Sequence, residues 1–196
     1  MINNPSVCLV ILAGGQSTRM GTDKAVIDFD GRRLIDILIS RYATIADPII
    51  LSARQAYDTG LPVISDDPEA PDGPVGAIFS VAARLQRHEP QIAGFVTVPV
   101  DAPYAPADLI ERLCASGSCA VAQDQQRLHP TFAYWRCDIV NRIRDAYEPG
   151  ERAPSLRWLA DKTDAKTVTW SDEGLFLNIN RPEDLVAAER RKKVGT

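Results

Sequence analysis

The 196-residue sequence predicts a three-layer α/β fold with a largely parallel sheet. Short apolar runs without polar alternation recur along the chain, as in strands that are buried on both faces of a sheet. Between these runs lie stretches with apolar residues three or four positions apart, which is the spacing of an amphipathic helix. Strands that alternate with helices favour a parallel sheet that is covered by helices on both faces.

The expected strands follow the apolar runs. The first run, VCLVIL at residues 7–12, stops abruptly at Ala13, Gly14 and Gly15. Later runs are shorter and predict strands at residues 49–51, 63–64, 94–98, 119–122 and 131–135. Ligands of such sheets bind outside the carboxyl ends of the strands, so the residues after each run are the candidates for a functional site.

The expected helices occupy four of the intervening stretches. Residues 34–42 place Leu34, Leu38 and Tyr42 on one face, and residues 76–85 show a similar spacing. Helices are also predicted at residues 106–113 and 182–189, each of which begins with a proline, a residue common in the first turn. Residues 66–74 are rich in proline, aspartate and glycine and are expected to form a loop.

Composition and charge predict one ordinary globular domain over residues 1–196, with 45% hydrophobic and 24% charged residues. The net charge is −4 and the basic run at residues 190–193 is short, which argues against a nucleic-acid partner. No apolar stretch approaches the roughly 20 residues of a membrane span. No basic segment precedes the run at residues 7–13, so a signal peptide is not indicated. We therefore expect a cytoplasmic protein with no membrane partner.

Cysteine and histidine usage gives no metal pattern. The spacing of the four cysteines fits no zinc site, and we expect free thiols or small apolar side chains at Cys8, Cys114, Cys119 and Cys137. The sequence has only two histidines, which excludes a histidine-rich metal site.

The connection after the first strand, LAGGQSTRMGTDK at residues 12–24, is the strongest functional pattern. Its three glycines let the backbone approach a ligand closely, and exposed N–H groups there can bind phosphate oxygens. Arg19 and Lys24 add positive charge. The segment is neither a P-loop nor a dinucleotide fingerprint. It predicts a phosphate-binding loop; the alternative is a glycine-rich turn with two surface cations.

Acidic residues follow two other predicted strands. Asp66 and Asp67 follow the run at residues 63–64, and Asp101 follows the strand at residues 94–98 within the motif PVD. A carboxylate in that position can hold Mg²⁺, which prefers oxygen ligands, or it can cap the next turn. The candidate phosphate loop at the same edge of the sheet favours the metal interpretation for Asp101.

Three further features leave alternatives open. Gly76 lies at the start of a predicted helix, where it is either a second site of close backbone approach or part of a tight turn. Asn178 and Asn180 share one side of an extended segment and can coordinate a metal, bind a ligand or cap the next helix. His129 is either a hydrogen-bonded structural residue or a ligand contact.

Together these residues resemble the molybdenum cofactor guanylyltransferases and the wider nucleotidyltransferase superfamily. The resemblance spans nearly the whole chain in the family's order. Its motifs are LAGGQSTRMGTDKA at residues 12–25, DGPVGAI at 72–78, PVDAPY at 99–104, HPTFA at 129–133, GER at 150–152 and FLNINRPEDL at 176–185. The first and last motifs are the most specific.

The resemblance implies a single-domain, Rossmann-like nucleotidyltransferase fold with a mostly parallel, mixed sheet. The family transfers GMP from GTP to molybdenum-bound molybdopterin and releases pyrophosphate, with Mg²⁺ as cofactor. GTP and a molybdopterin-type acceptor are therefore the expected partners, with transient contact to molybdoenzyme-maturation proteins.

The resemblance also assigns roles to residues. Arg19, Lys24 and Asp101 form the expected catalytic set, with Asp101 on the metal. His129, Asn178 and Asn180 are expected on the acceptor side. Nucleotide contacts are expected from Leu12, Ala13, Gly14, Lys24, Asp66 and Asp101. The glycines Gly15 and Gly76 are expected to join them. Because the acceptor phosphate is already ionised, the main catalytic task is to offset the repulsion between two anions.

Two departures from the family pattern concern the nucleotide. The family often has GPLAGI where this chain has GPVGAI at residues 73–78, and often has an asparagine that helps to hold the base where this chain has Ala53. Alanine cannot donate that side-chain hydrogen bond. The base therefore stays open between guanine and cytosine. The alternatives are another small-cofactor or sugar-phosphate nucleotidyltransferase that uses CTP, and a non-catalytic nucleotide-binding regulatory protein.

Overall fold

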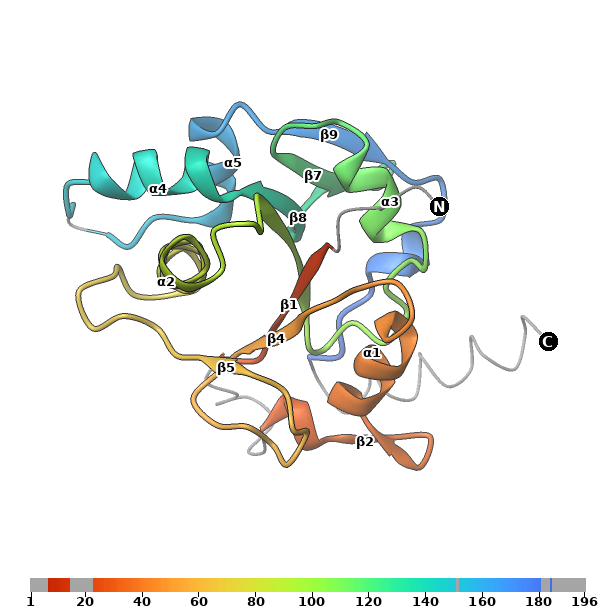
Figure 1. The fold of residues 1–196 in the computed structure, drawn as a ribbon. Coiled ribbons are helices and arrows are strands. Elements are labelled where there is room, and N and C mark those ends of the chain that lie inside the picture. Colours follow the sequence, from red (N-terminus) through yellow and green to blue (C-terminus); the bar gives the residue numbers. More distant parts are fainter. Residues whose placement is uncertain (1–6, 15–22, 151, 181–183, 185–196) are drawn as a thin grey trace, which may run out of the picture.

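A computed structural model describes residues 7–14, 23–150, 152–180 and 184. Its centre is a seven-stranded sheet in the order β5-β4-β1-β6-β8-β7-β9 (Figure 1). The strands are β1 (Cys8–Leu12), β4 (Ile49–Ser52), β5 (Val63–Ile64), β6 (Gly94–Pro99), β7 (Ala120–Gln123), β8 (Leu128–Arg136) and β9 (Lys166–Thr169). A small antiparallel hairpin of β2 (Asp28–Phe29) and β3 (Arg32–Arg33) stands apart from this sheet.

The sheet is mixed but mostly parallel. Strands β5, β4, β1 and β6 pair in parallel, as do β7 and β9. Strand β8 runs antiparallel to both of its neighbours, β6 and β7. The predicted fold class is thus confirmed. The carboxyl ends of β5, β4, β1 and β6 lie at one edge of the sheet, where the sequence places its candidate site residues.

Helices cover both faces of the sheet (Figure 1). On one face lie α1 (Leu34–Tyr42) and α3 (Leu109–Cys114). On the other lie α2 (Pro74–His88), α4 (Cys137–Asp145) and α5 (Leu156–Lys162). Two short 3₁₀ helices, η1 (Lys24–Val26) and η2 (Glu173–Phe176), complete the described elements. None of the described helices combines the length and the apolar character that crossing a membrane requires.

Strand β1 shows why the apolar runs lack alternation. Its side chains alternate between two hydrophobic cores: Leu9 and Ile11 pack on the side of α1 and α3, and Cys8 and Val10 pack on the side of α2, α4 and α5. Because helices exclude water from both faces, every position of the strand favours an apolar residue. The same strand pairs with β4 on one side and β6 on the other, so it places residues 13 and 14 at the centre of the carboxyl edge.

Two predicted helix boundaries are wrong by two or three residues. Helix α3 begins at Leu109 and not at residue 106, because residues 106–109 form a turn in which the Leu109 N–H donates to the Pro106 carbonyl at 3.2 Å. Helix α2 begins at Pro74, at the end of the segment that was expected to be a loop. Gly73 turns the chain there with a φ of 89°, and a proline fits the first helical position because its missing N–H has no helical partner.

Helices α4 and α5, strand β9 and the β2–β3 hairpin were not predicted. Helix α4 does carry a sequence signal that was missed, because Ile139, Val140 and Ile143 lie at helical spacing and pack on the core. Strand β9 lies at the sheet edge with a mostly exposed surface, and its polar residues do not stand out from a loop. The helix expected at residues 182–189 lies outside the described residues apart from Asp184.

All four cysteines are free thiols, as expected. Cys8, Cys119 and Cys137 are buried in the core on the side of α2. Burial, with a smaller contribution from Cys137, raises the pKa of Cys8 to about 12. These thiols therefore stay protonated at neutral pH and act as small apolar side chains.

Gly94 offers a test of how closely β6 and β8 pack. A Cβ atom at this position would lie 2.6 Å from the Trp135 carbonyl oxygen and 2.7 Å from the Tyr134 hydroxyl. We expect Gly94→Ala to lower the free energy of unfolding by about 1–3 kcal/mol through overpacking. Gly150→Ala is the matched control, because no atom of the described residues lies within 4 Å of a Cβ there. Urea unfolding of both variants measures the difference, and equal stability of the two would contradict the packing argument.

Candidate functional site

Three distant segments meet at the carboxyl edge of the sheet through the side chain of Lys24. Its ammonium donates hydrogen bonds to Oδ2 of Asp101 and to Oδ1 of Asn180, each at 2.5 Å. Lys24 begins η1, Asp101 follows β6, and Asn180 lies in the segment after η2. Asp101 is only 6% exposed, so the ammonium partly neutralises a nearly buried carboxylate. We call Lys24, Asp101 and Asn180 the Lys24 cluster.

Backbone hydrogen bonds fix the position of Asp101. The N–H of the preceding residue, Val100, donates to the carbonyl of Leu12 at 3.0 Å, which ties the end of β6 to the end of β1. The carbonyl of Asp101 accepts from the N–H of Ile179 at 2.8 Å. Residues 100–101 therefore connect the end of β1 with the segment that contains Asn178 and Asn180.

The end of β1 forms an open surface beside this cluster. The Ala13 N–H donates to the Ser52 carbonyl at 2.9 Å, which extends the pairing with β4 by one residue beyond Leu12. Gly14 is exposed, and the nearest protein atom to a Cβ built there is the Ser52 oxygen at 3.8 Å. Packing among the described residues thus does not require glycine at this position. Two other predicted site residues, Gly15 and Arg19, lie outside the described residues.

Gly76 and Asp66 lie on the side of α2 and are not drawn into the Lys24 cluster. A Cβ at Gly76 would lie 2.0 Å from the Pro71 carbonyl oxygen, so close packing of the preceding loop explains the glycine. Asp66 is exposed in that loop. Within the described part of the chain, no hydrogen bond or ion pair joins either residue to the cluster. Their contact with a nucleotide stays a prediction.

His129 is buried and has two well-defined contacts. Its Nε2 lies 2.7 Å from Oδ2 of Asp124, a hydrogen bond in which the imidazole donates to the carboxylate. Its ring stacks on Phe176, with centroids 4.5 Å apart and planes 19° apart. Phe176 also makes an edge contact with Phe132. These are the partners of a hydrogen-bonded structural histidine, the alternative that the sequence left open, and contact with an acceptor stays a prediction.

Asp124 organises the turn between β7 and β8, and sequence reasoning missed it. Its Oδ1 accepts the N–H groups of Gln126 and Arg127, both at 2.8 Å. Burial alone would raise the pKa of Asp124, but the hydrogen bonds from His129 and from these N–H groups outweigh it and lower the pKa to about 2. The Asp-Gln-Gln-Arg sequence between two apolar runs was the available signal, because aspartate often begins a turn.

The side-chain oxygen of Asn178 is buried and has no hydrogen-bond partner among the described residues. Asn178 precedes Ile179, whose N–H is fixed by Asp101, so its position is tied to the Lys24 cluster. A buried oxygen without a donor is unfavourable unless a ligand or water supplies one. This oxygen has almost no accessible surface, so contact between Asn178 and an acceptor stays a prediction.

Asp23 and Tyr57 are further polar residues at this edge that sequence reasoning missed. Asp23 caps η1, because its Oδ1 accepts the Ala25 N–H at 3.0 Å. Its other oxygen accepts the hydroxyl of Tyr57 at 2.7 Å. Tyr57 lies in an irregular connection between β4 and β5, where no periodicity marks it. Contact between the two residues depends on the tertiary fold.

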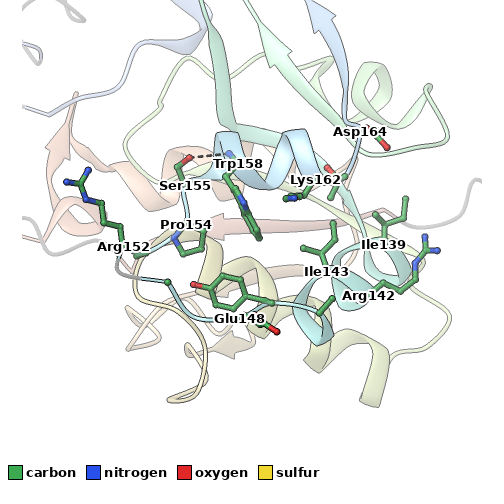
Figure 2. A pocket seen from close by; sticks show the side chains of 15 residues that line it. Ile139, Arg142, Ile143, Glu148, Arg152, Pro154, Ser155, Trp158, Lys162 and Asp164 are labelled. Carbon is green, nitrogen blue, oxygen red and sulfur yellow. Dashed lines mark hydrogen bonds between the residues drawn. The ribbon is translucent and has the colours of Figure 1, made fainter.

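A groove of about 930 Å³ lies between α4 and α5 and shares no residue with the Lys24 cluster. Figure 2 shows Trp158 of α5 projecting into it, with Ile139 and Ile143 of α4 nearby. Tyr147 forms an edge contact with Trp158 and another with Phe79 of α2. Trp158 and Tyr147 thus line the groove between α4 and α5, and Tyr147 also packs on α2. The groove contains none of the predicted site residues.

The Lys24 cluster has the chemistry of a phosphate and cation site. Lys24 has three N–H donors, of which Asp101 and Asn180 accept two, so among the described residues one donor is left for a phosphate oxygen. Asp101 and Asn180 present two oxygens to the same point, the kind of ligand that Mg²⁺ prefers. No group of three histidine, cysteine, aspartate or glutamate side chains capable of holding a metal occurs in the described ranges. A metal here would need further ligands from its substrate.

The fold is that of the nucleotidyltransferases. A nucleotidyl transferase from Methanothermobacter thermautotroptrophicus superposes with a TM-score of 0.68 at 14% identity, over 97% of this chain and 99% of that protein. The molybdopterin-guanine dinucleotide biosynthesis protein A of Archaeoglobus fulgidus superposes with a TM-score of 0.69 at 19% identity, over 95% and 99% of the two chains.

Sequence comparison narrows this class to one family. The chain belongs to the family of MobA-like NTP transferase domains, whose model matches residues 9–165. It is 34% identical over 187 residues to a protein of Cereibacter sphaeroides that is named molybdenum cofactor guanylyltransferase. That match covers 92% of this chain and 94% of the relative. The family that the sequence motifs resemble is thereby confirmed.

The depressed pKa of Asp124 predicts a specific loss of stability in acid. A carboxylate whose folded pKa is about 2, below the usual value near 3.9, stabilises the fold above pH 4 and loses that contribution as the pH falls towards 2. We expect Asp124→Asn to flatten the fall in unfolding free energy between pH 4 and pH 2. Asp145→Asn, at a carboxylate whose side chain is 67% exposed, is the control. Parallel wild-type and Asp124→Asn curves would contradict the assignment.

Proposed function

We propose that this protein transfers GMP from GTP to molybdenum-bound molybdopterin and releases pyrophosphate. Membership in the MobA-like NTP transferase family supports a nucleotide as the donor substrate. The name of the Cereibacter sphaeroides relative supports the guanylyl group and the molybdenum cofactor as acceptor. The observation that carries the proposal is the Lys24 cluster, which joins a cation and oxygen ligands at the carboxyl edge of the sheet.

The open end of β1 fits the donor nucleotide. Gly14 is exposed, and among the described residues no side chain fills the space that a Cβ would take. The Leu12 carbonyl and the Ala13 N–H already bond Val100 and Ser52, so the backbone of Gly14 is the part that can approach a nucleotide closely. Lys24 would bind a phosphate oxygen through its remaining N–H donor. The unsatisfied oxygen of Asn178 lies in the segment that we assign to the acceptor.

In the proposed reaction a terminal phosphate oxygen of the acceptor attacks the α-phosphorus of GTP. A new oxygen–phosphorus bond forms, and the bond from the α-phosphorus to the bridging oxygen of the β-phosphate breaks. Pyrophosphate leaves with the electron pair. The attacking oxygen is already ionised, so no side chain needs to remove a proton. The protein's task is to hold two anions in line and to offset their repulsion, which Lys24 does by its charge.

Asp101 and Asn180 are the residues that would hold Mg²⁺. The two oxygens that converge on the Lys24 ammonium suit a hard divalent cation, and substrate phosphates and water would complete its shell. The bound ion would supply positive charge against the developing pyrophosphate. Asp101 is nearly buried and is fixed by its carbonyl bond to Ile179. The Lys24 ammonium occupies the point on which the two oxygens converge, so Mg²⁺ would bind there only once Lys24 has moved to a substrate phosphate.

The substrate assignment is tested with each NTP separately. We expect GTP with molybdenum-bound molybdopterin to give stoichiometric pyrophosphate and a product heavier than the acceptor by one guanylyl group, as measured by mass spectrometry. ATP, CTP and UTP serve as matched donors, because Ala53 removes one expected contact with the base. Faster turnover with CTP would overturn the guanine assignment, and binding without pyrophosphate release would favour a non-catalytic protein.

The role of Asp101 is tested by substitution. We expect Asp101→Ala to lower kcat/KM by about 10²–10³, the loss typical for removal of one transition-state-stabilising group. Asp161→Ala, an exposed carboxylate on α5, should leave kcat/KM unchanged. Retention of full activity by Asp101→Ala at saturating Mg²⁺ would exclude a metal role for this residue.

Dependence on Mg²⁺ is tested without mutation. Chelation with EDTA should abolish pyrophosphate release, and added Mg²⁺ should restore it, because the described residues alone offer too few ligands to retain the ion. Asp101→Asn should shift the Mg²⁺ concentration for half-maximal activity upwards. Undiminished turnover in EDTA would contradict the magnesium proposal while leaving the nucleotide transfer intact.

A further inference from the structure

Tyr57 contacts both described ends of the glycine-rich connection. Its hydroxyl donates to Oδ2 of Asp23 at 2.7 Å and lies 3.3 Å from the carbonyl oxygen of Ala13. Ala13 precedes Gly14 at one end, and Asp23 precedes Lys24 at the other. A phenol has one hydroxyl proton. The shorter hydrogen bond, to the charged carboxylate of Asp23, is therefore the stronger, and the Ala13 carbonyl accepts the same proton only weakly.

The hydroxyl of Tyr57 is held as a donor. The residue is 8% exposed, and its ring packs in the core on the side of α1. Burial, together with a smaller contribution from the hydrogen bond to Asp23, raises the pKa of Tyr57 to about 12. At neutral pH the phenol therefore keeps its proton, and the hydrogen bond to Asp23 persists throughout the working range of the protein.

The backbone at Tyr57 adopts an unfavourable conformation. Tyr57 and Asp58 have φ values of 53° and 54°, in the left-handed region that bulky side chains rarely enter. The turn is closed by the Thr59 N–H, which donates to the Ala56 carbonyl at 3.2 Å. Arg33 supports it further, because its Nη1 donates to the Tyr57 carbonyl at 2.8 Å. A strained turn at a candidate site, where glycine would fit more easily, indicates that the direction of the side chain matters.

We propose that Tyr57 is a positioning residue that joins the two ends of the glycine-rich connection through its hydroxyl and so holds Lys24 at the phosphate-binding point. Asp23 transmits this effect. One of its carboxylate oxygens accepts the Tyr57 hydroxyl, and the other caps η1, the helix whose first residue is Lys24. The inference rests on the proposed role of this connection in binding the nucleotide. Tyr57 itself touches neither Lys24 nor the oxygens that Lys24 binds.

The first test removes one oxygen atom. Tyr57→Phe keeps the ring and loses the hydroxyl, and we expect kcat/KM for GTP to fall about tenfold as Lys24 loses its fixed position. Tyr42→Phe is the matched control, because Tyr42 is buried and its hydroxyl also donates to a backbone carbonyl, that of Pro106 at 2.8 Å. The control should change kcat/KM less than twofold, while thermal unfolding shows both variants folded.

The second test asks whether Tyr57 acts through Asp23. In an Asp23→Ala background the hydroxyl has lost its main acceptor, so Tyr57→Phe should cause no further loss of kcat/KM. Independent, multiplicative losses in the double variant would overturn the proposal, as would full activity of Tyr57→Phe alone. Binding of GTP to the wild-type protein is measured first by calorimetry. Absence of that binding would contradict the proposed function, whereas normal binding with an unaffected Tyr57→Phe variant would contradict this inference alone.

Discussion

The hydrogen bonds of the Lys24 ammonium to Asp101 and Asn180 are the interaction on which the arrangement of the site depends. They join the segment after β1, the end of β6 and the segment after η2 at one point. A nearly buried carboxylate without a partner would be strongly destabilising, so Asp101 needs a cation beside it. The cation that meets this need also has the charge that a phosphate-transferring site requires. Structural and chemical requirements therefore coincide in one side chain.

The fold was predictable where burial alone determines the sequence. Strand β1 lies between two cores and has to be apolar at every position, and α1 carries its apolar residues at helical spacing. Strand β9 could not be predicted, because it lies at an exposed edge, whereas helix α4 was missed although its apolar residues lie at helical spacing. The reversed direction of β8 leaves no mark in its own sequence, since it depends on which neighbour the strand pairs with.

The site was predictable where its residues lie in the motifs that carry the family resemblance. Lys24, Asp101 and Asn180 were all nominated from sequence, and the structure brings them together. Asp23 and Tyr57 were missed because their contact joins two irregular connections whose proximity only the tertiary fold determines. Asp124 was missed for a different reason. It orders a turn and orients His129, and because aspartate is frequent in turns, the sequence did not distinguish it from an ordinary turn residue.

The long separation between Lys24 and its amide partner has a consequence for synthesis of the protein. Asn180 follows Lys24 by 156 residues, and Asp101 follows it by 77. At about 5–20 residues per second, roughly 8–30 s pass between translation of the lysine and translation of the asparagine. During that interval the nascent chain can bury β1 between its neighbours and pair the lysine with the carboxylate. The amide can join them only after Asn180 has left the ribosome, later than every described strand of the central sheet, so the site is completed after most of the core has been synthesised.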